Sequence, residues 1–139
     1  MYQGGGHYKL RRNDLLYPEL SYKINGILFD IFRQVGGGHN EKFYQKCVRL
    51  GFEKERVFFK EQFYVPLKCY DKIVGKYFLD FLVDDKIILE LKRGRVITSR
   101  LIEQVEGYLK ALGLELALIA CFTYGGVFIK RIVNHDKIS

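Results

Sequence analysis

Residues 79–92 read Leu79-Asp80-Phe81-Leu82-Val83-Asp84-Asp85-Lys86-Ile87-Ile88-Leu89-Glu90-Leu91-Lys92, and this stretch decides the fold. Its two apolar runs flank a short polar segment, which is typical of two strands joined by a tight loop. Asp80, Glu90 and Lys92 are embedded in these runs. Burying a carboxylate costs several kcal/mol unless it is paired, hydrogen-bonded or bound to a metal. The pattern therefore predicts a metal site with a cation beside it, a combination suited to phosphodiester hydrolysis.

The length of the loop decides whether the two carboxylates share a face of the sheet. A three-residue loop would pair Val83 with Ile87. The same register places Asp80 opposite Glu90, and opposed residues of antiparallel strands have Cβ atoms roughly 4.5–5.5 Å apart. Lys92 follows two residues later, on the same face. A two-residue loop would instead send the carboxylates to opposite faces.

Two carboxylates at that separation repel each other unless a cation lies between them. Mg²⁺ (or Mn²⁺) suits the pair, because Mg²⁺ prefers oxygen ligands and keeps several waters. Such a metal polarises a phosphoryl oxygen or generates hydroxide from bound water. Lys92 would orient the attacking water or neutralise charge that develops on the transition state.

Hydrophobic periodicity predicts the elements around this stretch. Helical spacing predicts a helix over 21–35 with Ser21 as N-cap, ended by the glycine run 36–38. A second helix is expected over about 41–50, with Asn40 as N-cap and Gly51 as its stop. Alternating side chains predict a strand over 57–65, which ends at Pro66 or has Pro66 at a sheet edge. The remaining predictions are strands at about 67–70, 75–83, 87–92, 116–122 and 127–133, and a helix at about 99–112.

This order, α-α-β-β-β-α-β-β, predicts an α/β fold with a mixed sheet flanked by helices. The chain has 139 residues, 48% of them apolar, which is enough for one domain with a single core. We expect residues 1–18 to form a flexible lead-in and residues 19–139 to form the domain. No apolar run approaches the roughly 18 residues of a membrane helix, and the N-terminus lacks the apolar centre of a signal peptide. Three widely spaced cysteines indicate a reducing compartment, so a cytoplasmic protein is expected.

The net charge of +7 favours a polyanionic partner such as nucleic acid. Arg93, Arg95 and Arg100 follow the strand at 87–92. They would track a phosphate backbone, and the alternative is that they are solvated surface charges.

Asp80 followed by Glu90-Leu91-Lys92 resembles the Asp…Glu-x-Lys signature of the PD-(D/E)xK nuclease superfamily. Leu79 stands where that signature often has proline. The segment with Gly38, Glu41 and Tyr44 is similar to the Gly-x-x-Glu-x-x-Tyr motif of the GxxExxY proteins. These segments occur in the family's order.

A third segment, Gln104 to Tyr108, resembles the Gln-x-x-x-Tyr helix motif of several nucleases in the superfamily. The resemblance implies a restriction-endonuclease-like fold and a Mg²⁺-dependent (deoxyribo)nuclease that uses metal-activated water, with DNA as its partner. Gln104 would hydrogen-bond near the catalytic strand, and Tyr108 would support that strand or contact a phosphate.

The resemblance also implies a ligand set. Asp80 and Glu90 would bind the metal, with the backbone carbonyl of Leu91 as a further ligand, and Lys92 would be the catalytic lysine. Glu41 would approach the metal directly or through water.

Structural roles compete with these assignments. Glu41 would complement the dipole of its helix, Glu90 and Lys92 would form an ion pair on a solvated strand, and Tyr108 would belong to the core. The competing function is a catalytically silent nucleic-acid-binding or assembly module on the same fold. A homodimer or larger assembly is compatible with both functions.

Overall fold

The structure is a computed structural model that describes residues 16–138, so most of the predicted lead-in lies outside the described residues. The helices are α2 (Pro18–Val35), α3 (Glu41–Lys54), α4 (Ser99–Leu112) and α5 (His135–Ile138). The strands are β1 (Phe59–Cys69), β2 (Lys72–Val83), β3 (Ile87–Arg93), β4 (Leu116–Phe122) and β5 (Val127–Val133). The predicted α/β order is confirmed, and a short helix follows it. Within residues 16–138, no helix combines the length and apolar character needed to cross a bilayer.

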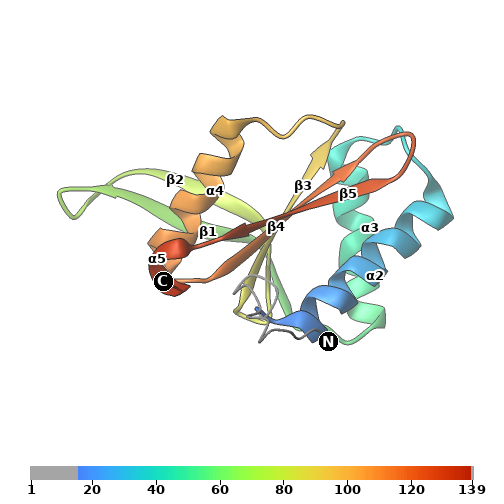
Figure 1. Cartoon of the computed structure of the whole chain (residues 1–139), viewed down its shortest axis with the longest axis horizontal. Coiled ribbons are helices and arrows are strands. Elements are labelled where there is room, and N and C mark those ends of the chain that lie inside the picture. Colours follow the sequence, from blue (N-terminus) through green and yellow to red (C-terminus); the bar gives the residue numbers. More distant parts are fainter. Residues whose placement is uncertain (1–15, 139) are drawn as a thin grey trace, which may run out of the picture.

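The five strands form one mixed sheet in the order β1-β2-β3-β4-β5. β3 and β4 run parallel and are connected through α4, whereas the other neighbours are antiparallel. α2 and α3 cover one face of the sheet and α4 covers the other (Figure 1). Each face therefore has its own hydrophobic cluster, and the central strands β3 and β4 are buried between them.

Helix α2 begins three residues before the predicted N-cap. Pro18 occupies the first turn, where its missing N–H is no loss and its fixed φ suits the helix. Ser21 is buried inside the helix, and its N–H donates to the carbonyl of Tyr17. The predicted N-cap at Ser21 is therefore wrong. The predicted end is confirmed, since the N–H of Gly36 donates to the carbonyl of Phe32.

Helix α3 begins where the sequence predicts but ends later. The side chain of Asn40 accepts a hydrogen bond from the N–H of Phe43, which confirms the N-cap. Gly51 does not stop the helix, which continues to Lys54. A Cβ at Gly51 would lie 2.6 Å from a methyl carbon of Ile27, so this glycine lets α3 approach α2 closely.

Strand β1 is longer than predicted and changes face partway. It continues through Pro66, which is tolerated because β1 is an edge strand. The alternation predicted for 57–65 does not keep one face, because Gln62 has φ 51° and turns the strand. Phe59 packs on the α2–α3 side, whereas Phe63 and Val65 pack on the α4 side.

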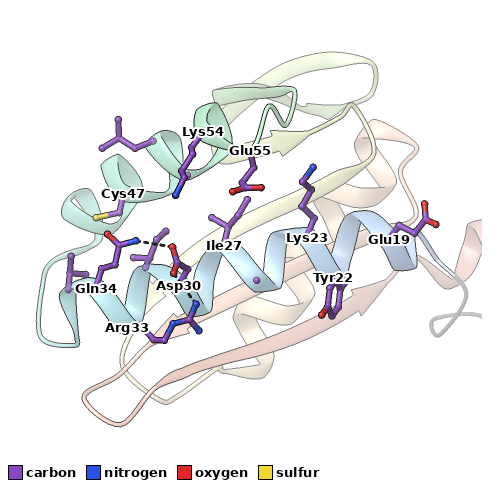
Figure 2. A pocket seen from close by; sticks show the side chains of 15 residues that line it. Glu19, Tyr22, Lys23, Ile27, Asp30, Arg33, Gln34, Cys47, Lys54 and Glu55 are labelled. Atoms are coloured by element: carbon purple, nitrogen blue, oxygen red, sulfur yellow. Dashed lines mark hydrogen bonds and ion pairs between the residues drawn. The ribbon is translucent and has the colours of Figure 1, made fainter.

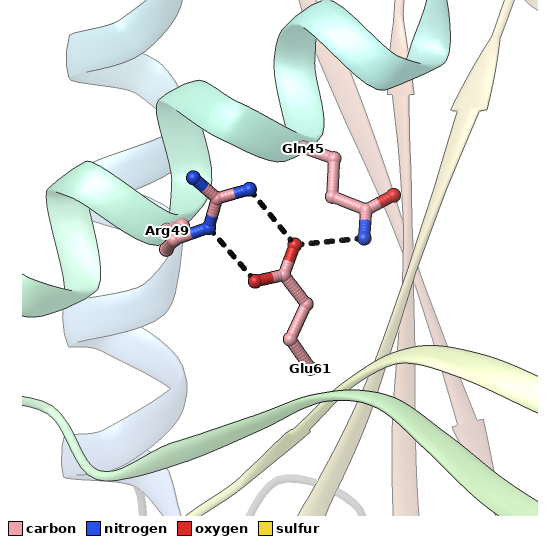
Figure 3. Close-up of polar contacts among 3 residues, drawn as sticks. All are labelled: Gln45, Arg49 and Glu61. Atoms are coloured by element: carbon pink, nitrogen blue, oxygen red, sulfur yellow. Dashed lines mark hydrogen bonds and ion pairs between the residues drawn. The ribbon is translucent and has the colours of Figure 1, made fainter.

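A polar clamp holds β1 to α3 immediately before this turn (Figure 3). Nε of Arg49 lies 2.8 Å from one carboxylate oxygen of Glu61, and the amide of Gln45 donates to the other at 2.9 Å. The side chain of Glu61 is 22% exposed, so solvent screens this ion pair only partly. The clamp fixes the point from which the rest of the β1–β2 hairpin extends.

Candidate metal centre and active site

The loop between β2 and β3 has the predicted length. Val83 pairs with Ile87, and the three residues between them form the turn. Asp84 and Asp85 both have positive φ, near 52° and 54°, which aspartate tolerates better than most residues. The predicted three-residue loop and the pairing of Val83 with Ile87 are therefore confirmed.

The backbone pairing opens at Asp80. Between β1 and β2, the paired register passes over Gln62 and Asp80. Between β2 and β3, the pairing extends from Val83 only as far as Phe81, the residue after Asp80. The expected direct pairing of Asp80 with Glu90 therefore does not form. Instead Oδ2 of Asp80 accepts a hydrogen bond from the N–H of Leu91 at 2.8 Å. The Asp80 side chain thus binds a backbone donor of β3 and links β2 to β3.

Glu90 is buried on the neighbouring strand, with 2% of its surface exposed. Its Oε2 is buried and has no hydrogen-bond partner. Burial and then the negative charge of Asp80 raise the pKa of Glu90 to about 9, while the positive charge of Lys92 acts in the opposite direction. An ion pair on a solvated strand is therefore wrong for Glu90. Without a cation, this carboxyl group keeps its proton at neutral pH.

A divalent cation fits the pair of carboxylates. It would provide the partner that Oε2 of Glu90 lacks and would remove the repulsion from Asp80. Within the described part of the chain, no group of three or more His, Cys, Asp and Glu side chains is arranged to hold an ion. Two carboxylates are nevertheless a common protein contribution to Mg²⁺, which keeps waters and takes substrate phosphates as further ligands. The roles of the Leu91 carbonyl and of Glu41 as ligands stay predictions.

Glu41 reaches the end of β3 from the first turn of α3. Its Oε2 accepts a hydrogen bond from the N–H of Arg93 at 3.1 Å. Tyr44 fixes this end of the helix, because its hydroxyl donates to the carbonyl of Gly36 at 2.8 Å and its ring stacks on Phe122 at 4.0 Å. A role limited to the helix dipole does not account for the bond to Arg93. The residues between Gly36 and Tyr44 thus bring a carboxylate next to the end of β3.

Lys92 is half-buried on β3, between Leu91 and Arg93. It faces Cys121 across the parallel pairing with β4. Its charge lowers the pKa of Glu90 against the larger effect of burial, so the ammonium lies within electrostatic reach of the carboxylate pair. This location matches the predicted combination of two acids and a cation.

Tyr108 of α4 is buried and stacks on Tyr77 of β2, with ring centroids 4.4 Å apart. The phenol pKa values of both are raised, first by burial and then by the charge of Glu90, so both lie near that carboxylate. Sequence reasoning missed Tyr77, although an aromatic residue three positions before Asp80 was a signal. Gln104 is exposed one turn earlier and, among the described residues, makes no side-chain hydrogen bond to β3.

The predicted arginines are exposed. Arg93 and Arg95 line a cavity of about 210 Å³ together with Gly38 and Tyr124, whereas Arg100 is not among its lining residues. A larger hollow of about 960 Å³ lies between α2 and α3 and is lined by none of the predicted site residues (Figure 2). The arginine-lined cavity is next to the site, since Arg93 is bonded to Glu41.

The sequence profile of the PD-(D/E)XK nuclease superfamily matches residues 18–132. The chain belongs to this superfamily. The crystal structure of SSO0001 resembles this PD-(D/E)XK chain with a TM-score of 0.55 and 13% sequence identity, over 66% of this chain and 48% of that one. At this identity the likeness shows the fold alone, and the chain spans about half the length of that protein. None of the curated proteins matches the chain.

Proposed function

We propose that this PD-(D/E)XK protein is a Mg²⁺-dependent nuclease that hydrolyses phosphodiester bonds in DNA in the cytoplasm, and that it is of the GxxExxY type. The observation that carries the proposal is the buried Glu90 oxygen without a hydrogen-bond partner, on a carboxylate next to Asp80. A buried carboxylate oxygen without a partner destabilises the fold unless a cation binds it. The half-buried Lys92 on the same strand supplies the second positive charge that a phosphate requires.

A divalent ion, when bound, supplies Lewis-acid polarisation of the phosphate and a lower pKa for water. In the reaction, the water loses one proton as its oxygen forms a bond to phosphorus, the ester P–O bond breaks, and the leaving oxygen takes up a proton. Lys92 donates to a non-bridging oxygen or orients the water, and so balances the charge that develops. One carboxylate oxygen of Glu41 accepts a hydrogen bond from the backbone N–H of Arg93. The other oxygen would bind a water near the site.

The test is cleavage of supercoiled DNA, linear duplex, single-stranded DNA and RNA with Mg²⁺ or Mn²⁺. Asp80→Asn, Glu90→Gln and Lys92→Ala should each lose at least roughly 100-fold in rate, the usual scale for removing one electrostatic contributor. Glu103→Gln, an exposed change on α4, is the matched control and should cut like the wild type. Equal cleavage by the wild type and all three site variants would identify a contaminating nuclease and contradict the proposal.

The burial of Glu90 also favours a second candidate function. A carboxyl group that is 2% exposed and protonated at neutral pH is compatible with a site that binds nucleic acid without cutting it. A silent module should bind equally well in EDTA, and Mg²⁺ should leave its melting temperature unchanged. A nuclease that binds the ion should be stabilised by it, by about 2.7 kcal/mol at a hundred times Kd.

A further inference from the structure

The outer part of the β1–β2 hairpin extends away from the body of the fold (Figure 1). Tyr64 of β1 and Phe78 of β2 lie directly opposite each other on this arm. Their ring centroids are 5.8 Å apart, and the two side chains are 44% and 43% exposed. Two large aromatic side chains thus form one exposed pair on an antiparallel ribbon.

The turn in β1 explains why this pair is exposed. Beyond Gln62, alternate residues such as Val65 and Leu79 pack on the α4 side. Successive residues of a strand point to opposite faces. Tyr64 and Phe78 therefore lie on the opposite face, which is the side that α3 covers only at the base of the hairpin, where it holds Glu61.

The charge of this arm is positive. Residues 64–78 contain three lysines and one aspartate. Nζ of Lys76 lies 5.8 Å from the ring centroid of Phe78, and Lys68 and Lys72 are exposed nearer the tip. The arm thus combines aromatic faces with cations, which favours a partner that is both anionic and aromatic.

We infer that this aromatic–lysine face, formed by Tyr64, Phe78 and Lys76, binds unpaired bases of a single-stranded nucleic acid. Base stacking on aromatic side chains needs an exposed face of the base, and lysines track the backbone. A paired duplex hides those faces. The lysines and Pro66 on the edge strand oppose the competing occupant, a second copy of the chain paired along β1.

The position of the face relates it to the candidate active site. Phe78 precedes Asp80 by two residues on β2, which is roughly 6–7 Å along a strand. A strand of nucleic acid stacked on Phe78 would therefore lie close to Asp80 along the hairpin, on the face opposite to Tyr77 and Tyr108. The inference deepens the proposed function and takes its substrate class from it, yet binding can be measured without cleavage.

Stacking can be observed directly, because the chain contains no tryptophan. Phe78→Trp introduces a single indole on the face, and Tyr22→Trp introduces one on α2, where Tyr22 is 81% exposed. Both are titrated in EDTA with an oligothymidylate of roughly 12 nucleotides, within the usual site size of a small domain. We expect quenching of the indole at position 78 by the single strand, little quenching by a duplex of equal length, and none at position 22.

Affinity measured by fluorescence anisotropy gives the second readout. Tyr64→Ala and Phe78→Ala should each weaken binding of the single strand roughly 5- to 100-fold. Tyr64→Phe keeps the ring and should bind like the wild type, as should Tyr22→Ala. The plot of log K against log salt has a negative slope, and Lys76→Ala should make this slope shallower by about 0.7, because one phosphate contact is lost.

Unchanged affinity in both alanine variants, equal affinity for duplex, or no binding of any oligonucleotide would overturn the inference. So would a dimer in sedimentation that Tyr64→Ala dissociates without affecting oligonucleotide binding. Metal-dependent cleavage is assayed separately. Aromatic-dependent binding without cleavage would uphold the inference and contradict only the proposed nuclease activity.

Discussion

The carboxylate of Asp80 accepts a hydrogen bond from the backbone N–H of Leu91 at 2.8 Å. The bond forms where the pairing of β2 with β3 has ended. One side chain therefore joins two strands and also presents a negative charge to Glu90. These two roles can be separated, because only the second one needs the charge.

Asp80→Asn and Asp80→Ala should separate structure from chemistry. Asparagine keeps an oxygen acceptor for the N–H of Leu91, so we expect a stability within about 1 kcal/mol of the wild type. Alanine leaves that N–H unsatisfied and should cost about 1–3 kcal/mol. Both variants should lose metal-dependent cleavage. Urea denaturation measures the first difference, and wild-type cleavage by Asp80→Asn would rule out a charged ligand at this position.

The raised pKa of Glu90 predicts a pH dependence of stability in the metal-free protein. Burial and Asp80 raise this pKa from 4.5 to about 9, so between these values the folded protein holds a proton that the unfolded chain has released. The stabilisation is complete below pH 4.5 and is lost as pH rises toward 9, with a slope of at most about 1.4 kcal/mol per pH unit. Glu90→Gln should remove this slope. Denaturation in EDTA across this range compares the two proteins, and parallel curves would contradict the assignment.

Binding of Mg²⁺ should displace the proton of Glu90. A cation between the carboxylates favours their charged forms. At pH 7.5 we expect release of about one proton per ion bound, and a higher affinity as pH rises. Calorimetry in two buffers of different ionisation enthalpy counts the protons. Glu90→Gln should show neither proton release nor thermal stabilisation by Mg²⁺, and proton release that persists in this variant would assign it to another group.

The sequence predicted those parts of the fold that are set by local chemistry. The Asn40 cap, the end of α2 at Gly36 and the loop after Val83 all depend on residues within a few positions of one another. The error at the end of α3 occurred where a distant contact decides, whereas the early start of α2 at Pro18 was a local signal that was missed. Gly51 lies inside α3, where the close approach of Ile27 of α2 leaves no room for a Cβ, and no local pattern reports that contact.

The features of the candidate site likewise fall into those set by local sequence and those set by contacts between distant residues. The proximity of Asp80 and Glu90 followed from counting a loop, whereas the bond from Arg93 to Glu41 joins residues 52 positions apart. Tyr77 was missed because its partner, Tyr108, comes from α4, the helix that connects β3 to β4. The turn at Gln62 could not be predicted, since glutamine has no particular preference for positive φ. The catalytic roles of these residues stay predictions.

Gly37 should tolerate alanine poorly, although sequence reasoning assigned Gly37 itself no role beyond its place in a glycine run that ends a helix. A Cβ at Gly37 would lie 2.4 Å from the carbonyl oxygen of Thr123 and 2.7 Å from Cα of Tyr124, so the backbone of the β4–β5 turn would have to move. We expect Gly37→Ala to cost about 1–3 kcal/mol, as overpacking does. Cleavage should fall as well, because the glycine run leads directly into the turn that carries Glu41.

Gly26→Ala is the matched control for this prediction. Gly26 lies within α2, and a Cβ there would meet nothing within 4 Å. Alanine in a helix interior should therefore stabilise the protein by about 0.5–1 kcal/mol. Chemical denaturation of the two variants gives changes of opposite sign if Gly37 is held by the close approach of the β4–β5 turn. Equal stabilisation by both would mean that Gly37 serves only to end α2, and the placement of Glu41 would then depend on Tyr44 and Asn40 alone.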